Sequence, residues 1–192
     1  MIFPIHVYGH PVLRKVTGNI DKSYKDLQQF IADMFETMYD SDGIGLAAPQ
    51  VGKSVRLFIV DTTSLKDEDP SLTDFKKVFI NPLILERIDE ITPFNEGCLS
   101  IPGIREDISR ESKIRISYYD GDFNFYDEWY DGVLSRIIQH EYDHLDGILF
   151  TDHLAPLKKR LLRNKLNGIS KGKFDVDYKT VLPGKKNGMK KK

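Results

Sequence analysis

A single domain that combines α-helices with β-strands is the fold that this sequence predicts, and three features predict it. The chain has 192 residues, 40% of them hydrophobic and 30% charged, an ordinary composition for one globular domain with a buried core. Three stretches carry apolar residues at helical spacing, and several others show the apolar or alternating pattern of strands. There is no internal repeat and no sign of a second domain, so we expect residues 1–184 to form one unit.

The first expected elements are a short extended piece and a helix. Residues 5–14 begin as an extended segment and contain a Gly-His-Pro turn signal. Between Tyr24 and Tyr39 the apolar residues recur every three or four positions, which predicts an amphipathic helix. Ser23 stands where an N-cap belongs, and Asp26 would lie in the first turn.

The middle of the chain predicts strands. Residues 55–61 are a strongly apolar run, typical of a buried strand, and residues 78–86 predict a second strand that Pro82 perturbs. The polar and acidic residues between them, 62–75, predict an exposed loop. Residues 114–119 alternate between apolar and other side chains, as a half-buried strand does.

The last third predicts a hairpin, two helices and a closing strand. A Gly-Asp turn at residues 121–122 leads into a further strand at 123–129. Apolar residues then recur at helical spacing through residues 131–147 and again through 154–166. Residues 174–181 alternate once more, which predicts an edge strand.

Charge is unevenly distributed along the chain. The net charge is -1, yet residues 185–192 hold five lysines and no acidic residue, so the remainder is acidic. An acidic body argues against direct nucleic-acid recognition, which requires a basic face. The lysine-rich end predicts a disordered tail. No apolar run approaches the roughly 20 residues that span a bilayer, and the N-terminus lacks signal-peptide features, so we expect a cytoplasmic protein without a membrane partner.

Two histidines in one motif indicate a possible metal site. His140, Glu141 and His144 form an H-E-x-x-H string within the predicted helix 131–147. This spacing puts both imidazoles on one helix face, where they can hold one divalent metal. Glu141 is placed to act as a general base beside it. The same string can also be an ordinary amphipathic helix, and two ligands do not complete a catalytic site.

A lone cysteine is the candidate third ligand. Cys98 is the only cysteine, which excludes an intramolecular disulfide and fits a reducing compartment. A single cysteine is most often a small buried hydrophobe. As a thiolate it would form, with His140 and His144, a set that suits Zn²⁺ or Fe²⁺ and leaves a fourth position for water. Spacing alone does not bring Cys98 to the helix, because 41 residues separate it from His140.

Three motifs, in order along the chain, resemble those of the peptide deformylase family. They are G-x-G-x-A-A-P-Q at Gly43 to Gln50, E-G-C-x-S at Glu96 to Ser100, and Q-H-E-x-D-H at Gln139 to His144, and the resemblance extends to about Gly172. It implies an α+β fold in which a central H-E-x-x-H metal helix packs against small antiparallel sheets, with an N-terminal and a C-terminal helix. It also implies hydrolytic removal of the N-formyl group from the formyl-methionine of nascent peptides.

The resemblance implies a role for individual residues as well. The three candidate ligands would bind one divalent metal per chain, natively Fe²⁺, with Zn²⁺ or Ni²⁺ possible in purified protein. Glu141 would take a proton from water and later give one to the leaving amine. The side chain of Gln50 and the backbone N–H of Leu99 would hold the developing oxyanion. Glu96 and Arg110 would form a supporting ion pair.

A methionine pocket is expected beside the metal. The residues expected to bind the formyl-methionine end are Ile44, Gly45, Phe94, Gly97, Val133 and Ile137. Ile137 and Val133 lie three and seven positions before His140 and therefore share its helix face. An apolar slot suits the thioether of methionine, provided that Arg136 turns outward.

Two departures from the family and two other functions stay open. The acidic segment 62–75 is longer than in compact members, and the strand-like C-terminus puts ribosome docking by a basic C-terminal helix in doubt. The alternatives are an H-E-x-x-H zinc endopeptidase and a structural metal protein. The first more often uses a third His or Glu ligand, and the second requires four protein ligands.

Overall fold

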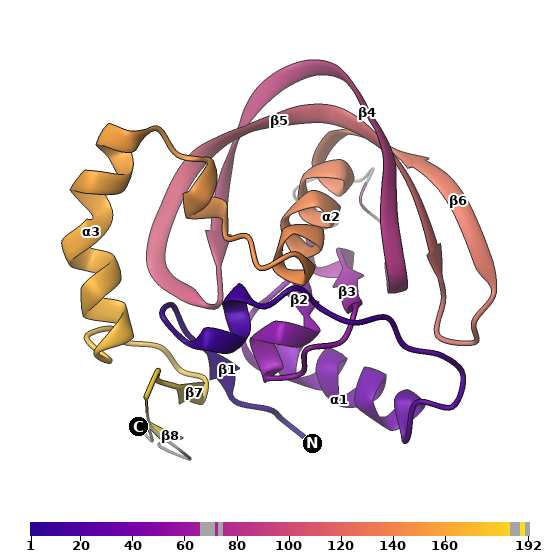
Figure 1. Cartoon of the computed structure of the whole chain (residues 1–192), viewed down its shortest axis with the longest axis horizontal. Helices are drawn as coiled ribbons and strands as arrows, with labels where there is room; N and C mark the ends of the chain where they lie inside the picture. Colours follow the sequence, from indigo (N-terminus) through magenta and orange to yellow (C-terminus); the bar gives the residue numbers. More distant parts are fainter. Residues whose placement is uncertain (66–71, 73–74, 185–188, 191–192) are drawn as a thin grey trace.

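The computed structural model of the protein describes residues 1–65, 72, 75–184 and 189–190. An antiparallel sheet with the order β2-β3-β4-β5-β6 forms its larger part (Figure 1). The strands of this sheet are β2 (Gly45–Ala47), β3 (Leu57–Asp61), β4 (Lys76–Cys98), β5 (Ile101–Tyr119) and β6 (Phe125–Tyr130). The α-helices are α1 (Leu27–Asp40), α2 (Gly132–Leu145) and α3 (Pro156–Ser170). The predicted α+β class is therefore confirmed.

A second, smaller sheet joins the two ends of the chain. It contains β1 (Ile5–His6), β7 (Thr180–Val181) and β8 (Met189–Lys190), in the order β1-β7-β8. β1 runs parallel to β7, whereas β7 and β8 are antiparallel. The expectation of antiparallel sheets thus holds for the larger sheet only. The predicted edge strand over 174–181 is shorter than expected, because only its last two residues pair.

The long hairpin of β4 and β5 is the main difference from the sequence prediction. The strand expected at 78–86 continues to Cys98, and the strand expected at 114–119 begins at Ile101. Beyond Ile80, β4 pairs with β5 alone, so its middle is largely exposed on both faces. Such a segment accepts charged side chains throughout and has no periodic apolar pattern to predict it. The expected perturbation at Pro82 is present as a register shift between Ile80 and Leu83.

Helix α2 lies in the hollow beneath the arch of β4 and β5 (Figure 1). Asp131 precedes its first residue, and every residue from Ser135 to Leu145 is buried. One of its faces packs against β2, β3 and β5 around Ile137, Ile138 and Leu145. A helix buried on all sides can hold polar side chains only where partners satisfy them, which makes the histidines and acids of α2 informative.

The remaining elements support this centre. Helix α1 begins at Leu27, three residues later than predicted, and packs its apolar side against β2 and β3. Ser23 does not cap it, since its hydroxyl donates to Asp21 and Asp26 occupies the N-cap position with a left-handed backbone. Short 3₁₀ turns η1 (Pro11–Arg14), η2 (Ala48–Val51), η3 (Thr63–Leu65) and η5 (Phe150–His153) connect the main elements.

Two expectations lie mainly outside the described residues. Most of the acidic segment 62–75 and most of the lysine-rich end 185–192 belong to the parts that are not described. Among the helices of the described residues, none combines the length and the apolar character that a membrane crossing requires.

Candidate metal centre and substrate cleft

Helix α2 presents two histidines one turn apart. His140 and His144 are buried, and their ring centroids are 5.2 Å apart. Nδ1 of His140 lies 2.9 Å from Oε2 of Glu96, which turns its other ring nitrogen, Nε2, away from Glu96. A histidine held in this way by a carboxylate has the tautomer and orientation typical of a metal ligand.

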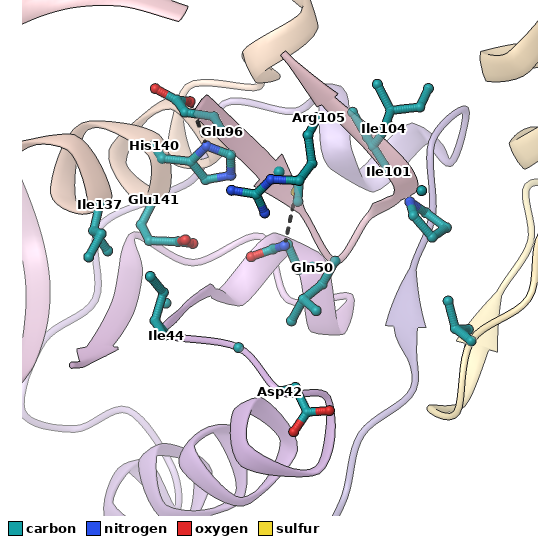
Figure 2. A pocket seen from close by; sticks show the side chains of 18 of the residues that line it. Asp42, Ile44, Gln50, Glu96, Ile101, Ile104, Arg105, Ile137, His140 and Glu141 are labelled. Atoms are coloured by element: carbon teal, nitrogen blue, oxygen red, sulfur yellow. Dashed lines mark hydrogen bonds and ion pairs between the residues drawn. The ribbon is translucent and has the colours of Figure 1, made fainter. Parts of the chain in front are cut away.

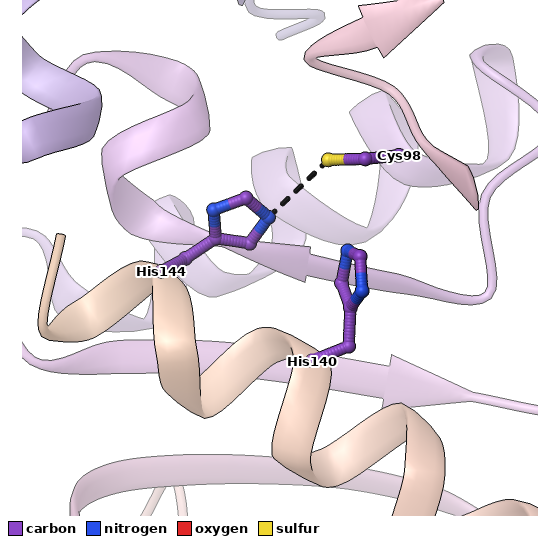
Figure 3. Close-up of side chains that lie close together, drawn as sticks. All are labelled: Cys98, His140 and His144. Carbon is purple, nitrogen blue, oxygen red and sulfur yellow. Dashed lines mark hydrogen bonds between the residues drawn. The ribbon is translucent and has the colours of Figure 1, made fainter. Parts of the chain in front are cut away.

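Cys98 reaches these histidines from the end of β4 (Figure 3). Its Sγ lies 3.3 Å from Nε2 of His144, and the three potential ligand atoms of Cys98, His140 and His144 lie within 4.8 Å of one another. Burial acts to raise the pKa of the Cys98 thiol, but the two histidines outweigh it and lower the pKa to about 5. One thiolate and two imidazoles fit Zn²⁺ or Fe²⁺ and leave a coordination position open. The residues present therefore fit a divalent metal.

Glu141 lies beside this cluster as a buried carboxylate. Its Oε2 has no hydrogen-bond partner among the described residues, and burial raises the pKa of Glu141 to about 7. Gly45 in β2 faces it, and a Cβ added to Gly45 would lie 2.6 Å from Oε1 of Glu141. A side chain at this position would collide with the carboxylate, so the close approach of Glu141 requires a glycine here.

Gln50 directs its side-chain amide toward the cysteine turn. The buried side chain accepts a hydrogen bond from the backbone N–H of Ala47 at 2.8 Å. Its Nε2 then lies 3.5 Å from Sγ of Cys98 and 3.3 Å from Oγ of Ser100. Figure 2 shows Gln50 among the side chains that line the pocket with His140 and Glu141. This arrangement follows from η2, which starts at Ala48 and carries Pro49 in its first turn. The role of Gln50 was predicted from the family resemblance alone, because nothing in the neighbouring sequence marks this residue as catalytic.

A buried ionic network supports His140 from behind. Arg110 in β5 donates to both oxygens of Glu96, at 2.7 and 3.0 Å, as the resemblance implied. It also donates to Oδ2 of Asp143 at 2.7 Å, and Nε2 of His153 lies 2.7 Å from the same oxygen. Burial acts to raise the pKa of Glu96, but hydrogen bonds with His140 and Arg110 hold it at about 2. Neither Asp143 nor His153 was predicted as part of the site, although Asp143 belongs to the Q-H-E-x-D-H string.

A cleft of about 550 Å³ opens onto this cluster. The predicted site residues that line it are Ile44, Gly45, Gln50, Gly97, Cys98, Leu99, Ile137, His140 and Glu141. Phe94 and Val133 are half-buried and are not among the described residues that line the cleft. Arg136 does line it and does not turn out to solvent, which corrects that expectation: its guanidinium donates to the backbone and hydroxyl oxygens of Thr92.

The fold and these side chains define a class of protein. A buried Cys-His-His cluster, a carboxylate with a raised pKa beside it and an open cleft are the features of a hydrolase with a single metal ion. Residues 2–160 match the polypeptide deformylase family. The chain belongs to this family.

Named relatives and solved structures agree with that assignment. The chain is 50% identical over 186 residues to the peptide deformylase of Cytophaga hutchinsonii, covering 97% of this chain and 100% of the relative. It is also 50% identical to that of Christiangramia forsetii, covering 97% and 98%. The crystal structure of a peptide deformylase from Legionella pneumophila superposes with a TM-score of 0.78 at 36% identity, covering 89% of this chain and 96% of that one. The Thermotoga maritima structure gives 0.73 at 39% identity, covering 81% and 99%.

Proposed function

We propose that this chain removes the N-formyl group from the formyl-methionine of nascent peptides and releases formate and a free amino terminus. The observation that carries the proposal is the convergence of Cys98, His140 and His144 within 4.8 Å, beside Glu141, in a member of the polypeptide deformylase family. The sequence relatives are named peptide deformylases, and the match extends over almost their whole length.

Cys98, His140 and His144 would hold one divalent metal. A mixed sulfur and nitrogen donor set accepts Fe²⁺, Zn²⁺ and Ni²⁺ alike. The family resemblance implies Fe²⁺ in the cell, with Zn²⁺ or Ni²⁺ in purified protein. When bound, the metal supplies Lewis-acid polarisation of the formyl carbonyl and a lowered pKa for the attacking water. Before a metal binds, His140 favours its protonated form, because Cys98 and Glu96 raise its pKa against the effect of burial. Metal uptake should therefore release protons.

Proton transfer falls to Glu141. Its raised pKa, about 7, suits a group that takes a proton from water and gives it to the leaving amine. Glu141 is buried in the wall of the cleft, and Gly45 faces it without a side chain that would displace the carboxylate.

Charge that develops on the formyl oxygen would be stabilised by donors at the cysteine turn. The amide of Gln50 points at this turn, and the backbone N–H of Leu99 follows Cys98 directly. Donors fixed before the reaction stabilise an oxyanion without reorganisation. The methionine side chain would lie against Ile44 and Ile137, while contacts by Phe94 and Val133 stay a prediction.

The peptide would continue along the cleft as an added strand. Gly45 at the start of β2 and Gly97 near the end of β4 both line the cleft, and neither carries a side chain that would block an extended backbone. We infer one catalytic domain over residues 1–184. We also infer that it acts in the cytoplasm, where formylated chains leave the ribosome. Direct ribosome docking through the exposed basic residues of α3 stays a prediction, which a pelleting assay with ribosomes would test.

Formate release distinguishes the proposed activity from the endopeptidase alternative. Wild-type protein loaded with metal should release formate from formyl-Met-Ala-Ser and leave the peptide bonds intact, as followed by mass spectrometry. The acetylated peptide and the Glu141→Gln variant serve as controls. Cleavage of an internal bond in an unformylated peptide, with no formate released, would contradict the proposal.

A further inference from the structure

The chain returns to the cleft after helix α3. Within residues 174–179 the side chains of Phe174, Val176 and Tyr178 are half-buried, and those between them are exposed. The segment then enters β7, where the backbone N–H of Ile5 donates to the carbonyl oxygen of Lys179 at 2.8 Å. In Figure 1 this yellow segment runs back from α3 toward β1. It is therefore anchored at both ends, by α3 and by the small sheet.

Two residues of this segment line the cleft that contains Glu141. Val176 and Tyr178 are among its lining residues, and the yellow segment borders the pocket in Figure 2. The hydroxyl of Tyr178 donates to the backbone carbonyl oxygen of Leu99 at 2.8 Å. Burial raises the pKa of Tyr178, so the hydroxyl stays protonated and remains a donor. Its ring packs against the apolar cluster of α1, β2 and β3.

The turn Leu99–Ser100 is thus held from three parts of the chain. Gln50 donates to Oγ of Ser100 at 3.3 Å, and the backbone N–H of Tyr8 donates to the Ser100 carbonyl oxygen at 2.8 Å. Tyr178 supplies the third contact, to Leu99. Without the Tyr178 hydrogen bond, the peptide unit that follows Leu99 can rotate. The Leu99 N–H belongs to the peptide unit that precedes Leu99, and the φ and ψ angles of Leu99 join these two units. The direction of the Leu99 N–H is consequently coupled to the Tyr178 hydroxyl.

We propose that residues 174–181 complete the substrate site, with Tyr178 as a positioning residue for the Leu99 turn and Val176 as a wall for a substrate residue after methionine. The segment lies beyond residues 2–160, which match the family. The chemistry of the wall favours an aliphatic side chain, because Leu99, Pro102 and Val176 line the same cleft. This inference rests on the proposed deformylase activity and adds a source of substrate preference to it.

Steady-state kinetics separate the two roles. Three substrates are compared: formyl-Met-Gly-Gly, formyl-Met-Leu-Gly and formyl-Met-Gly-Leu. Tyr178→Phe removes one hydrogen bond, so we expect kcat to fall about 3- to 10-fold with all three peptides and KM to change less than about 2-fold. Val176→Ala should lower kcat/KM about 3- to 10-fold for one leucine peptide and leave formyl-Met-Gly-Gly unchanged.

Matched variants control for general effects on packing. Tyr119 and Val55 are also half-buried and pack against the same apolar cluster as Tyr178, but they are not among the described residues that line the cleft. Tyr119→Phe and Val55→Ala should therefore leave all kinetic constants unchanged. Circular dichroism melting curves of all four variants identify any loss of folded protein.

The outcomes separate this inference from the proposed function. It is overturned if Tyr178→Phe keeps the wild-type kcat, or if kcat falls only in proportion to unfolded protein. It is also overturned if Val176→Ala affects the three peptides equally. If wild-type protein releases no formate from any of them, the proposed function itself is wrong.

Discussion

Replacing Arg110 by methionine should destabilise the protein strongly, because this guanidinium compensates two buried carboxylates. The Arg110 side chain is 5% exposed, and those of Glu96 and Asp143 are 4% and 9% exposed. Methionine fills a similar volume but donates no hydrogen bond. Among the side chains that the structure describes, Glu96 in Arg110→Met would keep only His140 as a partner, and Asp143 would keep only His153.

The expected loss follows from the geometry of these contacts. Three charge-assisted hydrogen bonds of 2.7 to 3.0 Å disappear, and two carboxylates stay buried without their counter-charge. Removing one partner of a buried ion pair typically costs about 3–5 kcal/mol of unfolding free energy. For a domain of this size each kcal/mol lowers the melting temperature by about 2–4 °C, so a decrease of roughly 10 °C is expected.

Urea denaturation of the chelated proteins measures this loss without a contribution from bound metal. Arg115→Met is the matched control, since Arg115 lies on the same strand and makes hydrogen bonds to Asp127 and Glu86 at the surface. In the control, water can solvate Asp127 and Glu86 once the arginine is removed, so Arg115→Met should lose far less stability. Equal losses in the two variants, or a loss below about 1 kcal/mol for Arg110→Met, would refute the reasoning.

Three further predictions concern catalysis, the metal and pH. Glu141→Gln should lower the rate of formate release at least ~100-fold and retain the metal; an empty site by elemental analysis, or near-normal turnover, would contradict the assignment. The Fe²⁺ form should lose activity in air as Cys98 oxidises, whereas the Zn²⁺ form persists; parallel decay of both would count against a thiolate ligand. Burial and the neighbouring His10 lower the pKa of His6 to about 4, so the folded state holds it neutral. The contribution of His6 to the free energy of unfolding is complete above pH 6.5 and is lost as pH falls toward 4, because the unfolded state binds the proton more tightly in this range. The full shift corresponds to roughly 3 kcal/mol, reduced to about 1–2 kcal/mol by the partial exposure of the ring. In urea titrations, the unfolding free energy of wild type should fall between pH 7 and pH 4 by that much more than the unfolding free energy of His6→Gln. An identical pH dependence of the two proteins would disprove the prediction.

Local patterns in the sequence predicted the elements whose apolar residues recur regularly. The three helices were predicted from apolar residues at helical spacing, although α2 is buried along most of its length, and β3 was predicted because it is apolar throughout. The middle of β4 escaped prediction because neither of its faces is covered. The N-cap at Ser23 failed for a different reason. Asp21 accepts a hydrogen bond from the Ser23 hydroxyl, and the residue that precedes the helix is Asp26, which has a left-handed backbone.

The motifs predicted which chemical groups the site contains but not what holds them in place. Cys98 meets His144 because the β4–β5 hairpin turns directly after Cys98 and arches over α2, and no local pattern encodes that approach. Val176 and Tyr178 belong to an alternating stretch that indicates burial of one face without naming the surface that covers it. The Leu99–Ser100 turn is contacted by Tyr8, which follows β1, by Gln50 in η2 and by Tyr178 in this C-terminal stretch. The motifs therefore predict the reaction. In our proposal, the preference for the residues after methionine depends on segments outside these motifs.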